Sequence, residues 1–238
     1  AGRIPPSRPA DKALENMLAN VSRRIAPDER ILATGHMDLV TSRGHYPART
    51  AWAVQKPSYL RLEVLPVIGT PDLILSATPE EMRIFLPSRA ELYEGPPTAD
   101  TMSQFLPWVF NMEDIVMIFS GDFPPLKGYP LSYEGYPEDS LFRVSMHVPA
   151  GESQTIWVDK SSHVVKLVRY GEDGRERYRV LWEDYAPSGR LAGKITLTMA
   201  DQTASLAVKF TDVQIEKSTD LSVFELPVPA GVKTIKVN

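Results

Sequence analysis

The ionisable and nucleophilic side chains of this sequence do not assemble a catalytic centre. The chain has 238 residues, four His and no Cys, so it supplies neither a thiol nucleophile nor a cysteine-based metal site. The phosphate-binding glycine loop, the serine elbow and the zinc-binding helix motif have fixed spacings, and none of these spacings occurs. We therefore expect a protein without enzymatic activity, metal or cofactor.

His36 and His45 are the two histidines that a hairpin would bring together. No carboxylate or third His has a matching spacing, so we expect no metal site. Adjacent acids such as Glu183 and Asp184 lie in predicted strands, where neighbouring side chains point to opposite faces. They cannot share a proton as a catalytic pair does, and we expect them to be solvated.

The charges of the chain argue against a nucleic-acid partner. Its net charge is -4 and it has no basic run, whereas nucleic-acid binding needs a basic face against the phosphates. Basic residues gather at Lys166, Arg169, Arg175, Arg177 and Arg179. This group fits either a solvated outer face, which we favour, or a stripe for anionic headgroups.

The hydrophobic pattern has a period of two residues from Glu29 onward, except in one segment. The alternation and the turn residues predict about eleven antiparallel strands in one curved sheet. In the last long strand the pattern changes phase, which predicts a bulge near Thr211 and Asp212. Residues 121–140, rich in Pro, Gly and Tyr, are expected to form a long surface loop, and residues 11–238 a single domain.

The N-terminal part is expected to hold a tether and a helix. Residues 1–10 contain three Pro among small and polar residues, which is typical of an extended, poorly packed tether. Over residues 12–25 the apolar positions recur with helical spacing and form one stripe, made by Leu14, Met17, Leu18, Val21 and Ile25. This helix should pack on the sheet.

Residues 97–123, which we call the insert, interrupt the strands with a strongly apolar helical pattern. Thr101 with Gln104 and Asn111 with Asp114 have the spacing of helix starts, and Pro107 separates them, so we expect two short helices. The insert is apolar on nearly all sides and too short to span a bilayer. It is either a core helix or a lid over an apolar cavity, with lid residues Phe105, Trp108, Phe110, Met112, Ile115 and Phe119.

The sequence has more large apolar side chains than the core on one face of a sheet would need. A ligand cavity lined by these side chains would explain the excess. Alternation assigns residues to faces within a strand, but it does not tell which face is concave. The candidate wall residues are Trp52, Leu60, Leu62, Val64, Leu73, Leu75, Ile84, Met146, Trp157, Leu197 and Met199.

The order of these segments resembles a known family. The N-terminal helix is followed by ILATGHMDL, KPSYLRLEVLP, PDLILSATPEEMRIFLPSRAELYEG, the insert and a closing GRLAGKITLTMADQTASLAVKFTDVQIEK. Together they resemble the bacterial Lol-type lipoprotein carriers and receptors, the LolA- and LolB-like proteins, over residues 14–232. The resemblance implies a mainly β fold, an open half β-barrel with an α-helical lid.

The resemblance also implies a function and a location. The cavity of that family holds lipoprotein acyl chains in transit, and an arginine on an early strand bonds the closed lid; Arg49 and Arg61 are both candidates here. A monomer in the periplasm is implied, and the tether suggests anchoring at the outer membrane through an N-terminal lipidated Cys that has been removed. The alternative is a periplasmic regulator or sensor that binds a lipidated ligand or a protein partner in the same half-barrel.

Overall fold

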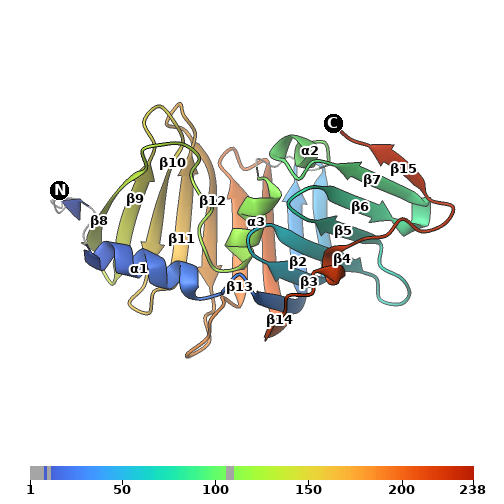
Figure 1. Ribbon diagram of the computed structural model, residues 1–238, viewed down its shortest axis with the longest axis horizontal. Helices are drawn as coiled ribbons and strands as arrows, with labels where there is room; N and C mark the ends of the chain where they lie inside the picture. The colour runs from blue at the N-terminus through green and yellow to red at the C-terminus, as the bar shows by residue number, and fades with distance from the viewer. Residues whose placement is uncertain (1–7, 10–11, 106–109) are drawn as a thin grey trace.

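The computed structural model describes residues 8–9, 12–105 and 110–238, and fifteen strands of these residues form one open sheet (Figure 1). The strands are β1 (Arg8–Pro9), β2 (Glu29–Thr41), β3 (Gly44–Gln55), β4 (Tyr59–Leu65), β5 (Leu73–Ala77), β6 (Met82–Leu86), β7 (Glu91–Gly95), β8 (Ser132–Glu138), β9 (Leu141–His147), β10 (Ser153–Val158), β11 (Val164–Tyr170), β12 (Glu176–Glu183), β13 (Lys194–Met199), β14 (Ala204–Lys217) and β15 (Lys233–Lys236). The predicted open antiparallel sheet is confirmed, with more strands than the expected eleven or so.

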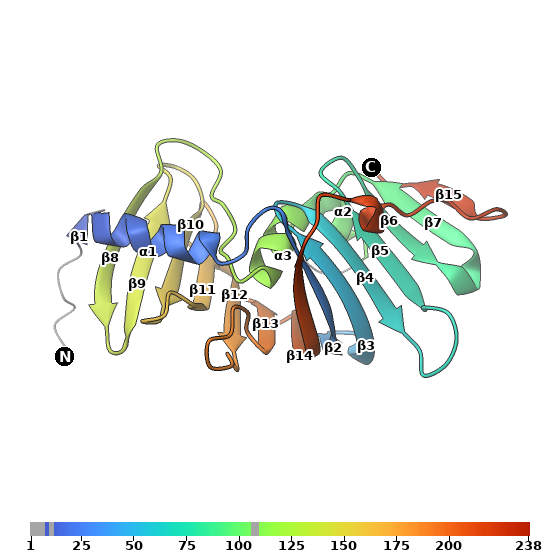
Figure 2. The same ribbon diagram turned by 60° about the horizontal axis from the view of Figure 1, so that its bottom comes forward.

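The sheet has two halves that meet where β14 pairs with β2. Strands β8 to β14 follow one another in space, as do β2 to β7, and β1 and β15 are the edge strands. The pairing of β14 with β2 runs from Ala204 opposite Thr41 to Lys217 opposite Glu29, with an irregularity between Phe210 and Asp212. The predicted bulge is therefore confirmed. Figure 2 shows that the sheet curves strongly instead of lying flat.

The strands that the sequence pattern missed are β1, β8 and β15. β8 lies within the expected surface loop and pairs with β9 along its whole length. Arg8 and Pro9, which were expected to belong to the tether, pair with Glu134 and Gly135 of β8; the rest of the tether lies outside the described residues. β15 pairs with β7 in the parallel direction.

Helix α1 (Lys12–Arg23) crosses the concave side of the β8–β12 half (Figures 1 and 2). Its apolar stripe faces the sheet: Leu14 and Val21 are buried, as is Ile25 just beyond the helix. Gly135 of β8 leaves room for this contact, since a Cβ there would lie 3.1 Å from Leu14 Cδ1. The predicted helix is confirmed, and its stripe forms part of the core.

The insert forms two short helices, α2 (Ala99–Ser103) and α3 (Met112–Phe119). The predicted start of α3 is confirmed, because Asn111 Oδ1 accepts from the Asp114 N–H at 2.8 Å and Asp114 Oδ2 accepts from the Asn111 N–H. The predicted start at Thr101 is wrong: Thr98 is the cap and accepts from the Thr101 N–H. None of the helices in the described residues is long and apolar enough to cross a membrane.

The C-terminal residues 218–229, which we call the strap, cross the convex face of the β2–β6 half. Their backbone carbonyls accept hydrogen bonds from side chains of successive strands: Asp220 from Arg30, Phe224 from Ser76 and Leu226 from Arg83. The short 3-10 helix η2 (Ser222–Phe224) buries Phe224 against Tyr59. The strap covers the face opposite the insert.

Candidate ligand-binding site

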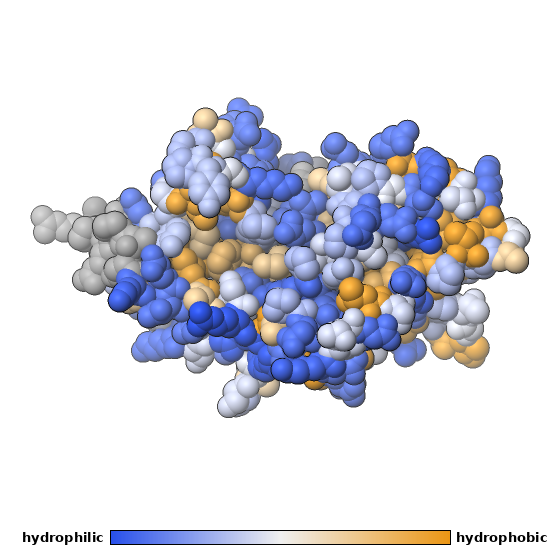
Figure 3. Space-filling view, viewed as in Figure 1, coloured by the Kyte–Doolittle hydropathy of each residue, from blue (hydrophilic) through white to orange (hydrophobic). Residues whose placement is uncertain are grey.

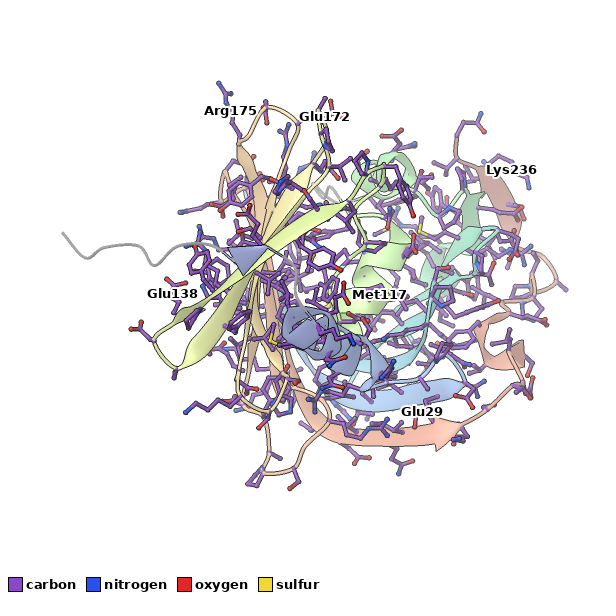
Figure 4. The ribbon with its side chains drawn as sticks, turned by 60° about the vertical axis from the view of Figure 1, so that its left-hand side comes forward. Glu29, Met117, Glu138, Glu172, Arg175 and Lys236 are labelled. Carbon is purple, nitrogen blue, oxygen red and sulfur yellow. The ribbon has the colours of Figure 1, made fainter. Side chains whose placement is uncertain are left out.

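Helix α3 lies in the trough of the sheet, where the two halves meet. Figure 4 looks along the trough and shows α3, with Met117, between the two arms of the sheet. The Phe119 ring stacks on Trp52 of β3 with centroids 4.5 Å apart. Trp182 of β12 donates its indole N–H to the Ile118 carbonyl at 2.9 Å. The insert is thus bound to both halves of the sheet.

The other described lid residues also contact the sheet. Phe110 is fully buried, and its ring centroid lies 4.3 Å from that of Tyr178 in β12. Met112 and Ile115 are buried in the same core. Phe105 is partly exposed and meets Tyr93 of β7 edge to face. Trp108 lies outside the described residues.

The concave face is filled by the protein itself in this structure. The apolar hollow between α3 and the strands, bordered by Phe119, Trp182 and Phe210, has a volume of only about 10 Å³. That is about the space of one water molecule and far below the few hundred Å³ of a ligand pocket. The expected cavity is therefore not open here, because the insert packs against the face that was expected to line it.

Most of the predicted wall residues lie on this filled face. The buried ones are Trp52, Leu60, Leu75, Ile84, Met146, Leu197 and Met199. Leu62 and Leu73 are half-buried and pack against the same core, and Val64 is half-buried and pairs with Leu73. They come from strands of both halves, so the trough brings together residues that are far apart in the sequence.

Trp157 is a wrong prediction, because its side chain lies on the convex face. It donates its indole N–H to Glu138 at 2.8 Å, and its ring is flanked by Lys166 and Arg143. Its neighbours in β10, Ile156 and Val158, are the residues that enter the core. An aromatic ring between two cations is typical of a solvated face.

Neither arginine proposed for the lid contact makes it with the described part of the insert. Arg61 lies under the strap, where it bonds the Val223 carbonyl at 3.3 Å and Glu63 at 2.9 Å. Arg49 is exposed and is paired in register with His36 and Leu65 at the rim of the sheet. The sequence pattern did not reveal that both side chains lie on the convex face, away from the insert.

A buried lysine, and not one of the two arginines, forms an ion pair with the insert. Lys56, at the end of β3, donates to Asp122 Oδ2 at 2.8 Å and to the Ser22 carbonyl of α1 at 2.9 Å. Asp122 follows α3 directly and is 1% exposed, while Lys56 is 7% exposed. This ion pair joins the insert, α1 and the sheet. Sequence reasoning missed it, because no local spacing signals a pair that is 66 residues apart.

A second buried polar cluster holds the chain after α3. Arg169 donates to Gln154 Oε1 at 2.6 Å and to the Pro125 carbonyl at 3.2 Å, and Gln154 donates to the Pro124 carbonyl at 2.9 Å. Arg169 is buried, so it does not belong to the basic group expected on an outer face. Its contacts fix the exit of the insert on the β8–β12 half.

A polar hollow of about 260 Å³ borders the N-terminus of α3, between Asn111, Asp114 and the side chains of β11 and β12. Asp114 is buried there, and burial raises the pKa of its carboxyl to about 6. The charge of Arg169 and the N–H of Asn111 act in the opposite direction. This polar hollow lies next to the apolar face that the insert covers, because Tyr178 lines the hollow and packs on Phe110.

The outer surface shows few features of a catalytic or metal centre. His45 bonds Asp38 at 2.9 Å, and the part of the chain that the structure describes holds no group of three or more His, Asp or Glu suited to a metal ion. Figure 3 shows apolar side chains in separate patches with polar ones between them. The insert and the face beneath it are the candidate site because apolar side chains of both halves of the sheet meet there.

Comparison by sequence finds no family model and no curated protein that matches the chain. By structure it is similar to a domain described as an outer membrane lipoprotein-sorting protein from Vibrio parahaemolyticus, with a TM-score of 0.62, 13% identity, and 88% of this chain and 94% of that chain covered.

Two further solved structures are similar to the same extent. A DUF1329 family protein from Desulfovibrio piger has a TM-score of 0.63 and 10% identity, with 90% and 96% of the chains covered. A LolA superfamily protein from Nitrosomonas europaea has a TM-score of 0.59 and 11% identity, with 89% and 97% covered. These similarities show that the chain has the LolA-like fold, an open, curved antiparallel sheet, as the sequence resemblance implied.

Proposed function

We propose that this protein binds the acyl chains of lipids or lipoproteins in its trough and carries or receives them in the bacterial cell envelope. The observation that carries the proposal is the insert itself, since α3, whose buried residues are apolar except for Asp114, lies in the middle of the concave face of a LolA-like sheet. Displacing this insert would free an apolar trough without unfolding the sheet. The protein acts by binding, and no chemical step is required.

The apolar contacts explain why such a carrier needs a competing insert. Burial of an acyl chain contributes roughly 0.8 kcal/mol per CH₂, so a long chain would be held very tightly in a permanently open trough. An insert that returns to the same surface lowers the net affinity and allows release. Met112 and Met117, with flexible side chains, suit an element that packs in two arrangements.

The proposed setting follows from the same function. The fold is shared with a domain described as lipoprotein-sorting, which supports the periplasm as the compartment. We also propose that the protein is a monomer that acts at the outer membrane. Extraction of the purified protein with organic solvent, followed by mass spectrometry, would identify a bound lipid.

The test compares two buried phenylalanines on opposite faces of the sheet. Phe119→Ala should destabilise the protein by roughly 3–5 kcal/mol and should strengthen the binding of a fluorescent fatty acid, because the closed insert loses more contacts than the bound state does. Phe224→Ala, under the strap, should destabilise to a similar extent without changing the affinity. Chemical unfolding and probe titration of both variants measure this.

The proposal is wrong if neither the wild-type protein nor Phe119→Ala binds the probe. It is also wrong if both variants lose stability but show the same affinity as the wild type. The second result would make α3 an ordinary core helix with no competing ligand.

A further inference from the structure

The polar hollow at the start of α3 contains a buried donor that the fold does not use. Tyr178 is 2% exposed and lines the hollow, and its hydroxyl has no hydrogen-bond partner among the described residues. Burial raises the pKa of the phenol well above its ordinary value, so the group remains a donor. Native proteins rarely leave a buried hydroxyl unpaired, because its desolvation is then not compensated.

The charges around this hydroxyl are balanced. The hollow is lined by three basic residues, Lys127, Arg169 and Arg177, and by three acidic ones, Glu113, Asp114 and Glu152. Arg169 is held by Gln154 and by Glu152, at 3.3 Å. Lys127 and Arg177 are exposed at the rim, where Arg177 also pairs with Asp173 at 3.3 Å. A simple anion would meet three carboxylates here, and a simple cation three basic groups. A group that carries both charges would find partners for each.

The hollow also adjoins the apolar site. The ring of Tyr178 packs on Phe110 of the insert, which is fully buried in the core. Asp114 lines the hollow from the first turn of α3. A ligand whose head lay in this hollow would therefore place its apolar part where the insert lies in the closed structure.

We propose that this hollow binds the polar head of an amphiphile that carries both a phosphate and an ammonium group, and that Tyr178 donates a hydrogen bond to the phosphate. Lys127 and Arg177 face the phosphate from the rim, and Glu113 and Glu152 face the ammonium group. This proposal rests on the proposed acyl-binding function and adds selectivity for the head.

The test uses three probes with the same acyl chain: a monoacylglycerol with a neutral head, a lysophosphatidylglycerol with a phosphate alone, and a lysophosphatidylethanolamine with both groups. All are titrated below the concentration at which they form micelles. The wild-type protein should bind the lysophosphatidylethanolamine about tenfold more tightly than the monoacylglycerol, the worth of one hydrogen bond to a charged group. It should bind the lysophosphatidylglycerol more weakly than the lysophosphatidylethanolamine.

Two variants and a control locate the effect. Tyr178→Phe keeps the ring that packs on Phe110 and removes only the unpaired hydroxyl, so it should reduce the preference for the lysophosphatidylethanolamine over the monoacylglycerol several-fold without lowering the unfolding temperature. Lys127→Ala should reduce the same ratio. Lys209→Ala removes an exposed lysine of β14 and should leave the ratio as in the wild type.

The outcomes separate this proposal from the proposed function. Equal binding of all three probes by the wild-type protein would overturn the head site while leaving acyl binding intact. Equal or tighter binding of the lysophosphatidylglycerol would make the hollow an anion site and overturn the requirement for an ammonium group. An unchanged ratio in Tyr178→Phe would remove the role of the hydroxyl, and no binding of any probe would overturn the proposed function itself.

Discussion

Asp114 lies between the apolar face under α3 and the polar hollow at the start of this helix. Its carboxylate caps the first turn of α3 through the Asn111 N–H, and its side chain borders the polar hollow. The cap favours the charged form, but burial disfavours it more strongly, and the nearby Glu113 and Glu152 add to this effect. The closed insert therefore contains a carboxyl group whose ionisation opposes the packing around it.

The first prediction is a pH dependence of stability that is due to Asp114. Its pKa is raised from an ordinary 3.8 to about 6 in the folded protein, so the folded state binds the proton more tightly than the unfolded state. The stabilisation is complete below the unfolded pKa and is lost as the pH rises through about 6. The loss is of the order of 3 kcal/mol.

Urea unfolding between pH 4 and pH 7 measures this contribution. Asp114→Asn keeps an acceptor for the Asn111 N–H and should abolish the Asp114 part of the slope. Glu113→Gln, on the neighbouring position of the same turn, should leave most of the slope in place. If Asp114→Asn has the same pH profile as the wild type, the carboxyl does not titrate with a raised pKa.

Helix α3 was predictable because its signals are local. Asn111 and Asp114 lie three residues apart and satisfy each other's backbone donors in the way that the spacing predicts. For α2 the same reasoning placed the helix start at Thr101, one turn too late. Thr98 and Thr101 are both hydroxyl residues, and Thr98 is the one with the extended backbone of a cap. Local chemistry thus predicts that a helix exists better than it predicts where it begins.

Strand β8 was not predictable from its own residues. Gly135 weakens the strand pattern, but a side chain there would collide with Phe142 and with Leu14 of α1. Pro137 lacks a donor and is tolerated in β8 because β1, on its other side, pairs only with Glu134 and Gly135. Gly135, which makes this segment look like a loop, is needed because Leu14 of α1 packs against it, and α1 is more than a hundred residues away in the chain.

The polar contacts that hold the insert are also non-local. Trp157 was assigned by alternation, which is correct within a strand but does not tell which face is concave. Arg61 was a candidate only through the family resemblance. Lys56 follows β3, Asp122 lies three residues after α3, and the two meet only in the folded protein. The apolar part of the site was therefore largely predictable, whereas the residues that fasten the insert were not.

The second prediction concerns this buried pair. Among the described residues, Lys56→Met leaves the buried Asp122 carboxylate with the Ser22 hydroxyl and the Phe123 N–H as partners. It should destabilise the protein by roughly 3–5 kcal/mol. Adding Asp122→Asn removes the unpaired charge and should recover part of the loss. Urea unfolding of the single and double variants measures both effects.

The matched control is an ion pair on the surface. Lys217 lies 3.7 Å from Asp28, and both side chains are exposed, so Lys217→Met should change stability very little. Strictly additive effects of Lys56→Met and Asp122→Asn would mean that the two side chains do not act as a pair.

At the scale of the whole molecule, α3 lies where the two halves of the sheet meet. β2 and β14 form the longest pairing of the sheet, and above this junction α3 contacts Trp52 in one half and Trp182 in the other. Release of α3 would remove contacts from both halves, while the β2–β14 pairing and the strap on the convex face would remain. The exchange of insert for ligand that we propose would therefore leave the sheet intact.

The last prediction uses the tryptophans to locate the bound chain. Two proteins are made in which all other Trp are replaced by Phe, one that retains Trp52 and one that retains Trp157. Trp52 faces the trough under Phe119, whereas Trp157 lies on the convex face between Lys166 and Arg143. If an acyl chain replaces α3, a brominated fatty acid should strongly quench the fluorescence of Trp52 and leave that of Trp157 unchanged, because bromine quenches only on close approach.

The same fatty acid without bromine provides the control for quenching, and the unfolding temperature of each protein shows that it is folded. Equal quenching of both tryptophans, or quenching of Trp157 alone, would place the chain outside the trough and contradict the exchange between insert and ligand.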